Sequence, residues 1–437
     1  MPGSCGRIVL ANGFVIAAPS SGSGKTLVTL GLLRALAETG IAVAPAKAGP
    51  DYIDPRFHEV AAGADCVNLD AWAMRPDTMR ALASSRDGLF IAEGVMGLFD
   101  GAVTGEGSTA DLAVHLGLPV ILVMDVERQA HTVAALVQGL AQFKPDCRIA
   151  GLIFNRTGSP RHGDIVKAAV EPLGIPVLGC IPNDRGLEVP SRHLGLVQAS
   201  EHPELEGFIS HAAAMVRDGL DLEALAALAQ PVKAAQGTQP FAPLGQRIAI
   251  AQDLAFSFIY RHVLDGWRAA GAELVPFSPL DDEAPDAAAD AVYLPGGYPE
   301  LHGAKLAVNK VFLDGLRAVA ARDALIFGEC GGYMVLGKTL IDGDGVGHDM
   351  VGLLDVTTSF AKRKLHLGYR RFTHQSPLPF APVLRGHEFH YSTLIHQEQG
   401  TPLFHAEDAA GNVLAPMGLQ KGKVLGSYAH IIDGGLG

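Results

Sequence analysis

Gly328-Glu329-Cys330-Gly331-Gly332 is the stretch that decides the fold of the C-terminal half. It follows the apolar run 324–327 and precedes the helix-like run 333–336, so we predict a strand, a sharp turn and a helix. Small residues on both sides of Cys330 allow the backbone to bend tightly and to hold the thiol above the sheet. This is the cysteine version of the Gly-x-Ser-x-Gly nucleophile elbow, and we interpret Cys330 as a nucleophile.

The composition limits the class of protein. With 437 residues the chain is too long for one ordinary core, and we expect two or three domains. The 48% hydrophobic and 18% charged residues are typical of a soluble globular protein, and no apolar run approaches the roughly 20 residues of a membrane span. We interpret residues 8–18 as a buried strand and not as a signal sequence, because Asn12 and Gly13 interrupt the run. A net charge of −12 argues against nucleic acid as a partner.

The five cysteines are scattered and show no Cys-x-x-Cys spacing. This pattern argues against a zinc site and against a disulfide framework, and it suits a reducing compartment. We therefore expect a cytoplasmic protein without a membrane partner.

Short apolar runs alternate with helical stretches along the first half of the chain. The apolar runs are residues 14–17, 88–92, 120–123 and 149–153, and the helical stretches include 26–38 and 129–143. Continuous apolar runs indicate strands buried on both faces, hence a parallel sheet. The pattern fails at 230–245, which is rich in Gln, Pro, Gly and Ala, and a second series begins at 247–251. We predict an α/β fold with one domain at 1–229, a linker at 230–245 and a second domain at 246–437.

A phosphate-binding loop follows the strand predicted at 14–17 and opens the next helix. It reads Pro19-Ser20-Ser21-Gly22-Ser23-Gly24-Lys25-Thr26, with Pro19 where the standard pattern has glycine. The backbone N–H groups of such a loop bind phosphates, Lys25 neutralises the β- and γ-phosphates, and Thr26 reaches Mg²⁺. The alternative is a Gly/Ser turn with a surface lysine. We assign ATP binding to Ser21, Gly22, Ser23, Gly24, Lys25 and Thr26.

Acidic residues follow two of the predicted strands. Glu93 comes directly after the apolar run 88–92, where a carboxylate commonly supports the metal of a phosphate site. The loop 47–55 carries a lysine and two further carboxylates, Asp51 and Asp54. Taken singly, these two aspartates are equally explained as turn residues beside proline.

Cys330 needs a base and an oxyanion hole. His430, at the end of the apolar stretch 424–429, is the best downstream candidate for the base, although 17 histidines make a chance match a real alternative. The turn Gly296-Gly297 exposes backbone N–H groups after the predicted strand 291–293. The N–H groups of Gly297 and Gly331 are the candidate oxyanion hole, the alternative being a plain type II turn.

Taken together, these segments resemble the cobyrinic/hydrogenobyrinic acid a,c-diamide synthase family over nearly the whole chain. The matching motifs are the loop at 21–26, Gly-Pro-Asp-Tyr-Ile-Asp-Pro at 49–55, Glu-Gly-Val-Met-Gly-Leu-Phe-Asp-Gly at 93–101 and Pro-Ser-Arg-His-Leu-Gly-Leu at 190–196. The resemblance implies an N-terminal P-loop domain similar in fold to dethiobiotin synthetase. The order of the 294–300, 328–332 and 424–430 segments resembles the class I glutamine amidotransferases, which implies that fold for the C-terminal domain.

The resemblance also implies ligands and their contacts. Mg²⁺ would be held by Thr26, Asp51 and Glu93, and the adenine of ATP would lie near Asn155, for which a strand-end cap is the nearly equal alternative. Substrate contacts would come from Tyr52, Asp54, Arg192 and His193. Arg185, 362–364 and Arg370-Arg371 are further basic candidates, although charge on a solvated strand edge explains the last two clusters at least as well. We read His387 and His390 as active-site lining or core, and not as zinc ligands.

One position departs from the family pattern. Many relatives carry a glutamate two residues after the catalytic histidine, where this chain has Ile432 followed by Asp433. Either Asp433 serves in its place or the site works as a Cys–His dyad. We therefore assign no third catalytic residue.

The expected reaction is amidation of the a and c carboxylates of hydrogenobyrinic acid in cobalamin biosynthesis, driven by ATP and using ammonia released from glutamine at Cys330. ATP phosphorylates the carboxylate, and ammonia then displaces phosphate. Cobyrinic acid is the alternative substrate, and the sequence does not fix the oligomeric state, for which a homodimer is the candidate. The alternative from another class is a partition-type regulatory ATPase, which has no need of Cys330.

Overall fold

The computed structural model describes residues 11–184, 191–192, 195–196, 204–237 and 241–435. The chain divides into two compact units, Met1–Thr238 and Gln239–Gly437. Of the basic residues considered above, Arg185 and His193 lie outside the described residues, and for Arg192 only its place in a two-residue strand is described.

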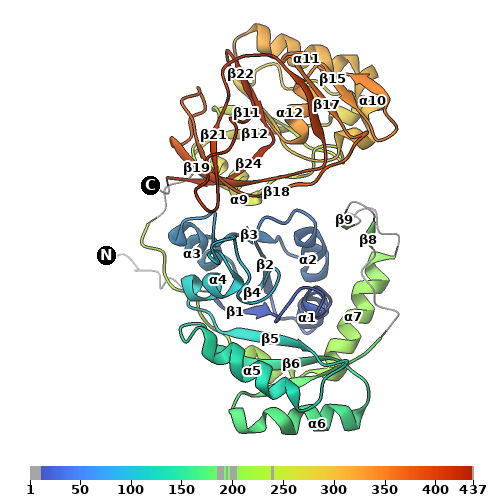
Figure 1. Cartoon of the computed structure of the whole chain (residues 1–437), viewed down its shortest axis with the longest axis vertical. Coiled ribbons are helices and arrows are strands. Elements are labelled where there is room, and N and C mark those ends of the chain that lie inside the picture. Colours follow the sequence, from blue (N-terminus) through green and yellow to red (C-terminus); the bar gives the residue numbers. More distant parts are fainter. Residues whose placement is uncertain (1–10, 185–190, 193–194, 197–203, 238–240, 436–437) are drawn as a thin grey trace, which may run out of the picture. The chain divides into compact units, whose positions relative to one another are not determined.

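Unit 1 is built on a mostly parallel sheet with the strand order β3-β2-β4-β1-β5-β6-β7 (Figure 1). Its strands are β1 (Asn12–Ala17), β2 (Val43–Ala48), β3 (Val67–Leu69), β4 (Leu89–Glu93), β5 (Val120–Asp125), β6 (Ile149–Thr157) and β7 (Val177–Pro182). The interior of the sheet is apolar on both faces, with Phe14, Ile91 and Leu122 fully buried. This confirms the parallel sheet predicted from continuous apolar runs.

Helices cover both faces of this sheet. They are α1 (Lys25–Glu38), α2 (Asp54–Ala62), α3 (Pro76–Ser84), α4 (Thr109–Leu116), α5 (Thr132–Phe143), α6 (Pro160–Val170), α7 (Leu205–Gly219) and α8 (Leu222–Ala227). α1 packs against α2 and α7, and α3 packs against α4 on the opposite face (Figure 1). The short strands β8 (Ser191–Arg192) and β9 (Gly195–Leu196) pair with each other.

The C-terminal end of unit 1 returns to the sheet. Gln230 and Pro231, which the sequence pattern places at the start of the linker, form β10 (Gln230–Pro231) and pair antiparallel with Asn12 and Gly13 of β1. The Gln/Pro composition conceals this pairing because a two-residue strand has no periodicity.

Three neighbouring strands of unit 1 end together. Ile16 of β1 is the register partner of Glu93 on β4, and Glu93 is in turn the partner of Lys47 on β2. The phosphate loop leaves β1 at this edge, so a loop, an acid and a lysine from three segments are brought side by side.

Unit 2 has a central six-stranded sheet of order β12-β11-β13-β14-β23-β22. Its strands are β11 (Arg247–Ala251), β12 (Glu273–Phe277), β13 (Ala291–Leu294), β14 (Leu325–Glu329), β22 (Leu419–Lys421) and β23 (Val424–Ser427). All pairs in it are parallel except β22 with β23. The helices of the unit are α9 (Arg261–Ala269), α10 (Gly303–Val308), α11 (Lys310–Ala321) and α12 (Gly331–Leu336).

Two smaller sheets complete unit 2. One has the order β16-β15-β17-β20, with β15 (Thr339–Ile341), β16 (Gly347–Asp349), β17 (Val356–Ser359) and β20 (Thr393–Gln397). The other has the order β21-β18-β19-β24, with β18 (His366–Thr373), β19 (Val383–His390), β21 (His405–Asp408) and β24 (Ala429–Gly434). Since β18 lies between β21 and β19, Arg370 and Arg371 are on an inner strand, and the strand-edge interpretation of this pair is wrong.

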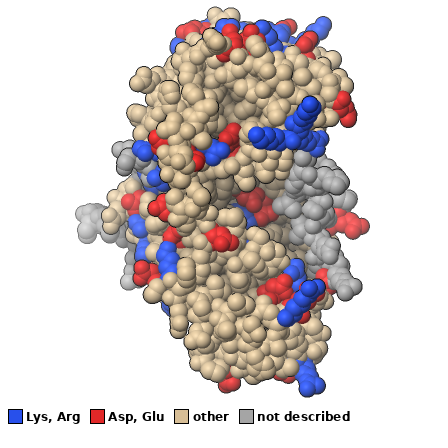
Figure 2. Space-filling view, in the orientation of Figure 1, with Lys and Arg blue, Asp and Glu red and all other residues tan. Residues whose placement is uncertain are grey.

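Charged residues make up 18% of the chain. Figure 2 shows basic and acidic side chains interspersed among a larger number of uncharged residues on the face drawn. Among the described residues, no helix combines the length and apolar character that crossing a membrane requires.

Candidate functional site

The phosphate loop in unit 1 has the backbone that its glycines permit. Gly22 and Gly24 have φ angles of 80° and 87°, in the left-handed region that favours glycine. The side-chain hydroxyl of Ser23 donates to the Ser20 carbonyl at 2.9 Å, which closes the loop on itself. Lys25 starts α1 and donates from Nζ to the Met96 carbonyl at 2.6 Å. The loop therefore presents backbone N–H groups and a helix N-terminus, as a phosphate site requires.

Glu93 is the centre of a buried cluster behind this loop. Its Oε1 accepts from Thr26 Oγ1 and from Lys47 Nζ, both at 2.7 Å, and its Oε2 lies 2.7 Å from His58 Nε2. Glu93 and His58 are fully buried. Burial alone would raise the pKa of Glu93, but Lys47 and then His58 hold it well below its usual range, and the carboxylate stays ionised.

Lys47 connects the Glu93 cluster to the 49–55 motif. Its Nζ donates to Asp54 Oδ2 at 2.5 Å and lies 3.9 Å from Asp51 Oδ2. Burial would lower the pKa of Lys47, but Glu93 and Asp54 raise it above the ordinary value, so the lysine is charged. Burial also raises the pKa of Asp54 to about 6 against the opposing effect of Lys47.

The proposed metal ligands are brought together in part. Thr26 and Glu93 are hydrogen-bonded to each other. Asp51 is linked to Glu93 only indirectly, because Lys47 forms ion pairs with both carboxylates. Asp51 Oδ1 accepts from the N–H groups of Ile53 and Asp54 at 2.8 and 3.0 Å, which is the turn role that was the alternative for this residue. A hydroxyl and carboxylates beside a phosphate loop are the oxygen donors that Mg²⁺ prefers, and this donor set fits that ion.

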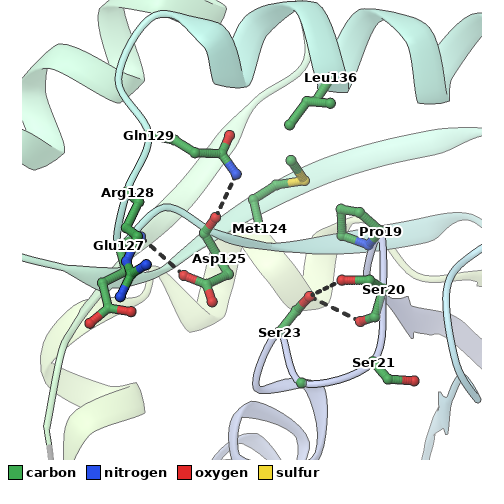
Figure 3. Close-up of a pocket in the computed structure, with 11 residues that line it drawn as sticks. Pro19, Ser20, Ser21, Ser23, Met124, Asp125, Glu127, Arg128, Gln129 and Leu136 are labelled. Atoms are coloured by element: carbon green, nitrogen blue, oxygen red, sulfur yellow. Dashed lines mark hydrogen bonds between the residues drawn. The ribbon is translucent and has the colours of Figure 1, made fainter.

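A pocket opens beside the phosphate loop (Figure 3). It has a volume of about 360 Å³, and its lining comprises Pro19, Ser20, Ser21, Gly22, Ser23, Met124, Asp125, Glu127, Arg128, Gln129 and Leu136. Figure 3 shows Met124 and Leu136 across the pocket from the loop, with Gln129 donating from Nε2 to the Asp125 carbonyl at 3.0 Å. An apolar wall with polar groups at its rim beside phosphate-binding N–H groups suits a nucleoside.

Asn155 lies beneath the phosphate loop. The sequence pattern predicts that Asn155 follows a strand ending at Phe154, but β6 continues through Asn155 to Thr157. The Asn155 Nδ2 donates to the Ser23 carbonyl at 3.0 Å. A Cβ on Gly24 would come within 2.2 Å of the same amide nitrogen, so the contact needs glycine at 24. The described contacts make Asn155 a support of the loop, and its contact with adenine stays a prediction.

The nucleophile elbow predicted in unit 2 is present. Cys330 lies between β14 and α12 with φ 46° and ψ −101°, a strained conformation for a residue with a side chain. A Cβ on Gly332 would come within 2.0 Å of the Leu294 carbonyl oxygen, and one on Gly328 within 2.8 Å of Gly332. Both glycines are therefore required for the sharp turn that holds the thiol.

His430 and the Gly-Gly turn lie against Cys330. A Cβ on Gly296 would be 2.5 Å from His430 Cε1 and 3.3 Å from Cys330 Cβ, so one glycine touches both side chains. A Cβ on Gly331 would be 3.1 Å from the Gly297 nitrogen, and the Gly331 N–H interacts with the thiol. The structure thus brings together the nucleophile, the base and both oxyanion-hole candidates.

Cys330 and His430 are both uncharged in the absence of substrate. Burial raises the pKa of Cys330 far above its usual range, and Glu300 adds to this effect. Burial lowers the pKa of His430 well below its ordinary value, with His387 and His390 acting in the same direction. The thiol keeps its proton, and the neutral imidazole is able to accept that proton when substrate binds.

Ile432 stands at the position of the orienting glutamate, and the base is instead contacted by a second histidine. The His387 ring stacks on the His430 ring, and His387 Nε2 lies 2.7 Å from the Tyr260 hydroxyl. Asp433 Oδ1 accepts from the Gly434 N–H at 2.8 Å, and its charge acts on His262. Sequence reasoning places His387 in the active-site lining or in the core but does not pair it with His430, because the two residues meet only across β19 and β24.

Glu329 joins the strands that carry the nucleophile and the base. This fully enclosed carboxylate, next to Cys330, accepts from the Tyr293 hydroxyl at 2.6 Å and from the Ile431 N–H at 3.0 Å. Burial raises its pKa to about 7. Sequence reasoning missed this role, although the position directly before the nucleophile was the available signal.

A histidine and acid group lies on β18 and β19. One ligand atom each from His366, Glu388 and His390 lies within 4.8 Å of the others. However, His390 Nδ1 lies 3.0 Å from the Ser392 carbonyl and Nε2 lies 3.0 Å from Glu388, which also binds Arg370 at 2.8 Å. We interpret the group as a hydrogen-bonded network and not as a metal centre.

Comparison with known proteins identifies both units. The profile of the family described as "CobQ/CobB/MinD/ParA nucleotide binding domain" matches residues 14–197, and that of the "CobB/CobQ-like glutamine amidotransferase domain" matches residues 247–434. A Brucella anthropi protein named hydrogenobyrinate a,c-diamide synthase is 54% identical over 428 residues, covering 96% of this chain and 98% of its own. Proteins of the same name from Rhizobium meliloti and Agrobacterium fabrum are 53% and 49% identical over 97% of this chain and 99% of their own.

Proposed function

The chain belongs to the hydrogenobyrinate a,c-diamide synthase family, and we propose that it amidates the a and c carboxylates of hydrogenobyrinate with ATP and glutamine. It is a ligase that forms C–N bonds, with a nucleotide-binding domain and a glutamine amidotransferase domain. The observation that carries the proposal is that one chain holds both a phosphate loop backed by the Glu93 cluster and a thiol elbow backed by His430.

The synthetase reaction follows from the groups in unit 1. The loop N–H groups and Lys25 bind the phosphates of ATP, and the pocket lined by Met124 and Leu136 receives the nucleoside. Mg²⁺ held by Thr26, Glu93 and Asp51 would neutralise phosphate charge during transfer. A substrate carboxylate oxygen attacks the γ-phosphorus and releases ADP, and ammonia then attacks the acyl carbon and expels phosphate.

The glutaminase reaction follows from the groups in unit 2. His430 takes the Cys330 proton as sulfur attacks the amide carbon of glutamine, and the N–H groups of Gly297 and Gly331 stabilise the oxyanion. His430 returns the proton to the leaving nitrogen, and ammonia departs from a glutamyl thioester. Water activated by His430 then hydrolyses the thioester to glutamate and restores the thiol.

The two reactions need each other for chemical reasons. A carboxylate is a poor electrophile until it is phosphorylated. Ammonia in water at pH 7 is mostly protonated and is not nucleophilic, because the pKa of the amine lies well above neutrality. Releasing ammonia from glutamine within the protein supplies the neutral nucleophile.

Several finer assignments belong to the proposal. Tyr52, Asp54, Arg192 and His193 are candidate contacts to the acid substrate. The ion pair between Asp54 and Lys47 favours a role for Asp54 in holding the lysine near transferred phosphate. A homodimer is the candidate assembly, which light scattering would establish.

Paired variants test the proposal. Cys330→Ala should lose glutamine-dependent amidation and keep amidation with an added ammonium salt, whereas Lys25→Ala should lose both. Cys147→Ala and Lys167→Ala, at residues away from both sites, are the matched controls. Full glutamine-dependent activity in Cys330→Ala, or product formation by Lys25→Ala, would contradict the assignment. Mass spectrometry of products from hydrogenobyrinic and cobyrinic acids identifies the preferred substrate.

A further inference from the structure

Glu300 places an unmatched carboxylate oxygen beside the glutaminase nucleophile. It lies in the single 3-10 turn Pro299–Leu301, directly after the Gly-Gly turn that touches Cys330 and His430. Its Oε2 is buried, and no group among the described residues donates a hydrogen bond to it. The carboxylate does accept from its own backbone N–H. One oxygen is therefore left for a donor that the described part of the chain does not supply.

The turn that carries Glu300 is fixed against the elbow. A Cβ on Gly331 would come within 2.9 Å of the Pro299 ring, so the residue before Glu300 packs on the residue after Cys330. Pro299 is itself buried, which anchors the start of the turn. The position of the carboxylate near the thiol is thus set by backbone packing and does not depend on a flexible loop.

The Glu300 carboxylate is unfavourable to ionise and unfavourable for the nearby thiolate. Burial raises its pKa to about 7, and Arg363 acts to lower it. Among charged groups, Glu300 has the largest effect in raising the pKa of Cys330, so it opposes formation of the thiolate. A buried carboxylate oxygen without a donor among the described residues, on an acid that also hinders the nucleophile, is a cost that a ligand of opposite charge would remove.

Glutamine brings that charge. Its amide must lie at Cys330, and its only cationic group is the α-ammonium at the other end of a short side chain. We propose that Glu300 binds the α-ammonium of glutamine and is a specificity-determining residue of the glutaminase. This inference rests on glutamine being the nitrogen donor.

The same contact prepares the nucleophile. When the ammonium pairs with Glu300, the negative field of this carboxylate at Cys330 is neutralised, and proton transfer from Cys330 to His430 becomes easier. The thiol is therefore less reactive in the free enzyme than in the glutamine complex. An amide that lacks an α-amino group occupies the site without this effect.

The test compares glutamine with 4-carbamoylbutanoate, which is glutamine without its α-amino group. In Glu300→Gln we expect kcat/KM for glutamine to fall about 100-fold, as is typical when a buried charged partner is left unmatched. For 4-carbamoylbutanoate the variant should equal or exceed the wild type, because removing the charge also removes the negative field at Cys330. Glu300→Asp, which keeps the charge at a shorter reach, should lose less on glutamine and nothing on the analogue. Glu273→Gln, at an exposed acid of the same unit, is the control.

Two further measurements separate this inference from the proposed function. Ammonium-dependent amidation should be unchanged in Glu300→Gln, since it does not use the glutaminase. Alkylation of Cys330 by iodoacetamide, followed by peptide mass spectrometry, should be faster in Glu300→Gln than in the wild type.

Equal losses on both amides, or undiminished kcat/KM for glutamine, would overturn the role of Glu300. A wild type without ammonium-dependent amidation would instead overturn the proposed function. If Glu300→Gln does not fold, Glu300→Asp decides, because selective loss on glutamine supports the inference and equal loss refutes it.

Discussion

The imidazole rings of His387 and His430 stack face to face, with centroids 4.8 Å apart and planes 5° apart. His387 is buried, and burial lowers its pKa to about 3, so it faces His430 as a neutral ring. Its Nε2 is held 2.7 Å from the Tyr260 hydroxyl. His430 is thus held against a fixed aromatic partner, and Ile432 stands where the family pattern has a glutamate.

Removing this ring should impair the base. We expect His387→Ala to lower glutaminase kcat by about 10-fold or more, because His430 loses the surface that fixes its plane. His387→Phe keeps a flat neutral ring and should retain most of the activity. The measurement is glutamate release against pH, with ammonium-dependent amidation as the control. Equal activity of the Ala and Phe variants at wild-type level would rule out positioning by the stack.

Gly296 leaves no room for a side chain between the nucleophile and the base. An added Cβ would come 2.5 Å from His430 Cε1 and 3.3 Å from Cys330 Cβ, so Gly296→Ala must push the histidine away. We expect glutamine hydrolysis to fall at least 100-fold, the effect that small displacements of catalytic groups commonly have. Gly345→Ala is the steric control, because nothing lies within 4 Å of a Cβ added there, although its positive φ carries backbone strain. Normal hydrolysis in Gly296→Ala would contradict the placement of His430.

The parts that the sequence reveals are those encoded locally. The phosphate loop and the Cys330 elbow are each a run of neighbouring residues between a strand and a helix. Glycine spacing, the reactive side chain and the flanking apolar and helical runs together predict them. His430 was found because it ends an apolar run in the expected order. These features needed no knowledge of how distant strands pair.

The other contacts of the two sites depend on which distant strands pair, and no local sequence pattern predicts that pairing. Lys47 meets Glu93 because β2 and β4 are neighbours in the sheet, and His58 reaches Glu93 from a helix whose periodicity does not single it out. His387 meets His430 across β19 and β24, and the two-residue strand β10 is hidden in a composition typical of linkers. Lysine and histidine are common residue types, and these particular residues become part of a site only because the sheet topology brings them there.

Lys47 holds two buried carboxylates, and its loss should destabilise unit 1. In Lys47→Met, Glu93 and Asp54 lose the cation that both contact, which costs about 3–5 kcal/mol when a buried pair is broken. Hydrogen exchange of unit 1 peptides measures this. Lys167→Met, at an exposed lysine of α6, should change nothing. Unaltered exchange in Lys47→Met would show that the cluster does not stabilise the unit.

Asn155 distinguishes loop support from base recognition. Because its Nδ2 donates to the Ser23 carbonyl at 3.0 Å, Asn155→Ala should loosen the phosphate loop and lower kcat/KM for ATP by about 10-fold. GTP, tested at concentrations that give measurable turnover, should lose the same factor. Loss of the preference for ATP over GTP would instead make Asn155 an adenine contact, as the family resemblance implies.

The stability of unit 2 should fall between about pH 4.5 and 7 because of Glu329. Its pKa is raised by burial to about 7 from the ordinary value of 4.5, so the native state holds a proton that the unfolded state releases across this range. The stabilisation is complete below the unfolded pKa and is lost as pH rises through the folded one, an effect of about 3 kcal/mol at 1.36 kcal/mol per pKa unit. Glu300, also raised to about 7, adds to the slope.

Denaturant unfolding followed by Trp267 fluorescence in a Trp72→Phe background reports on unit 2, since the chain has only these 2 tryptophans. Glu329→Gln has no proton to release and should flatten the pH dependence, even though its amide cannot accept from both Tyr293 and Ile431 as the carboxylate does. Glu329→Gln combined with Glu300→Gln should flatten it further, whereas the exposed Glu273→Gln should leave it as in the wild type. A slope in Glu329→Gln equal to that of the wild type would show that Glu329 is already ionised in the folded protein, and that the strands of Cys330 and His430 are joined through a charged acceptor.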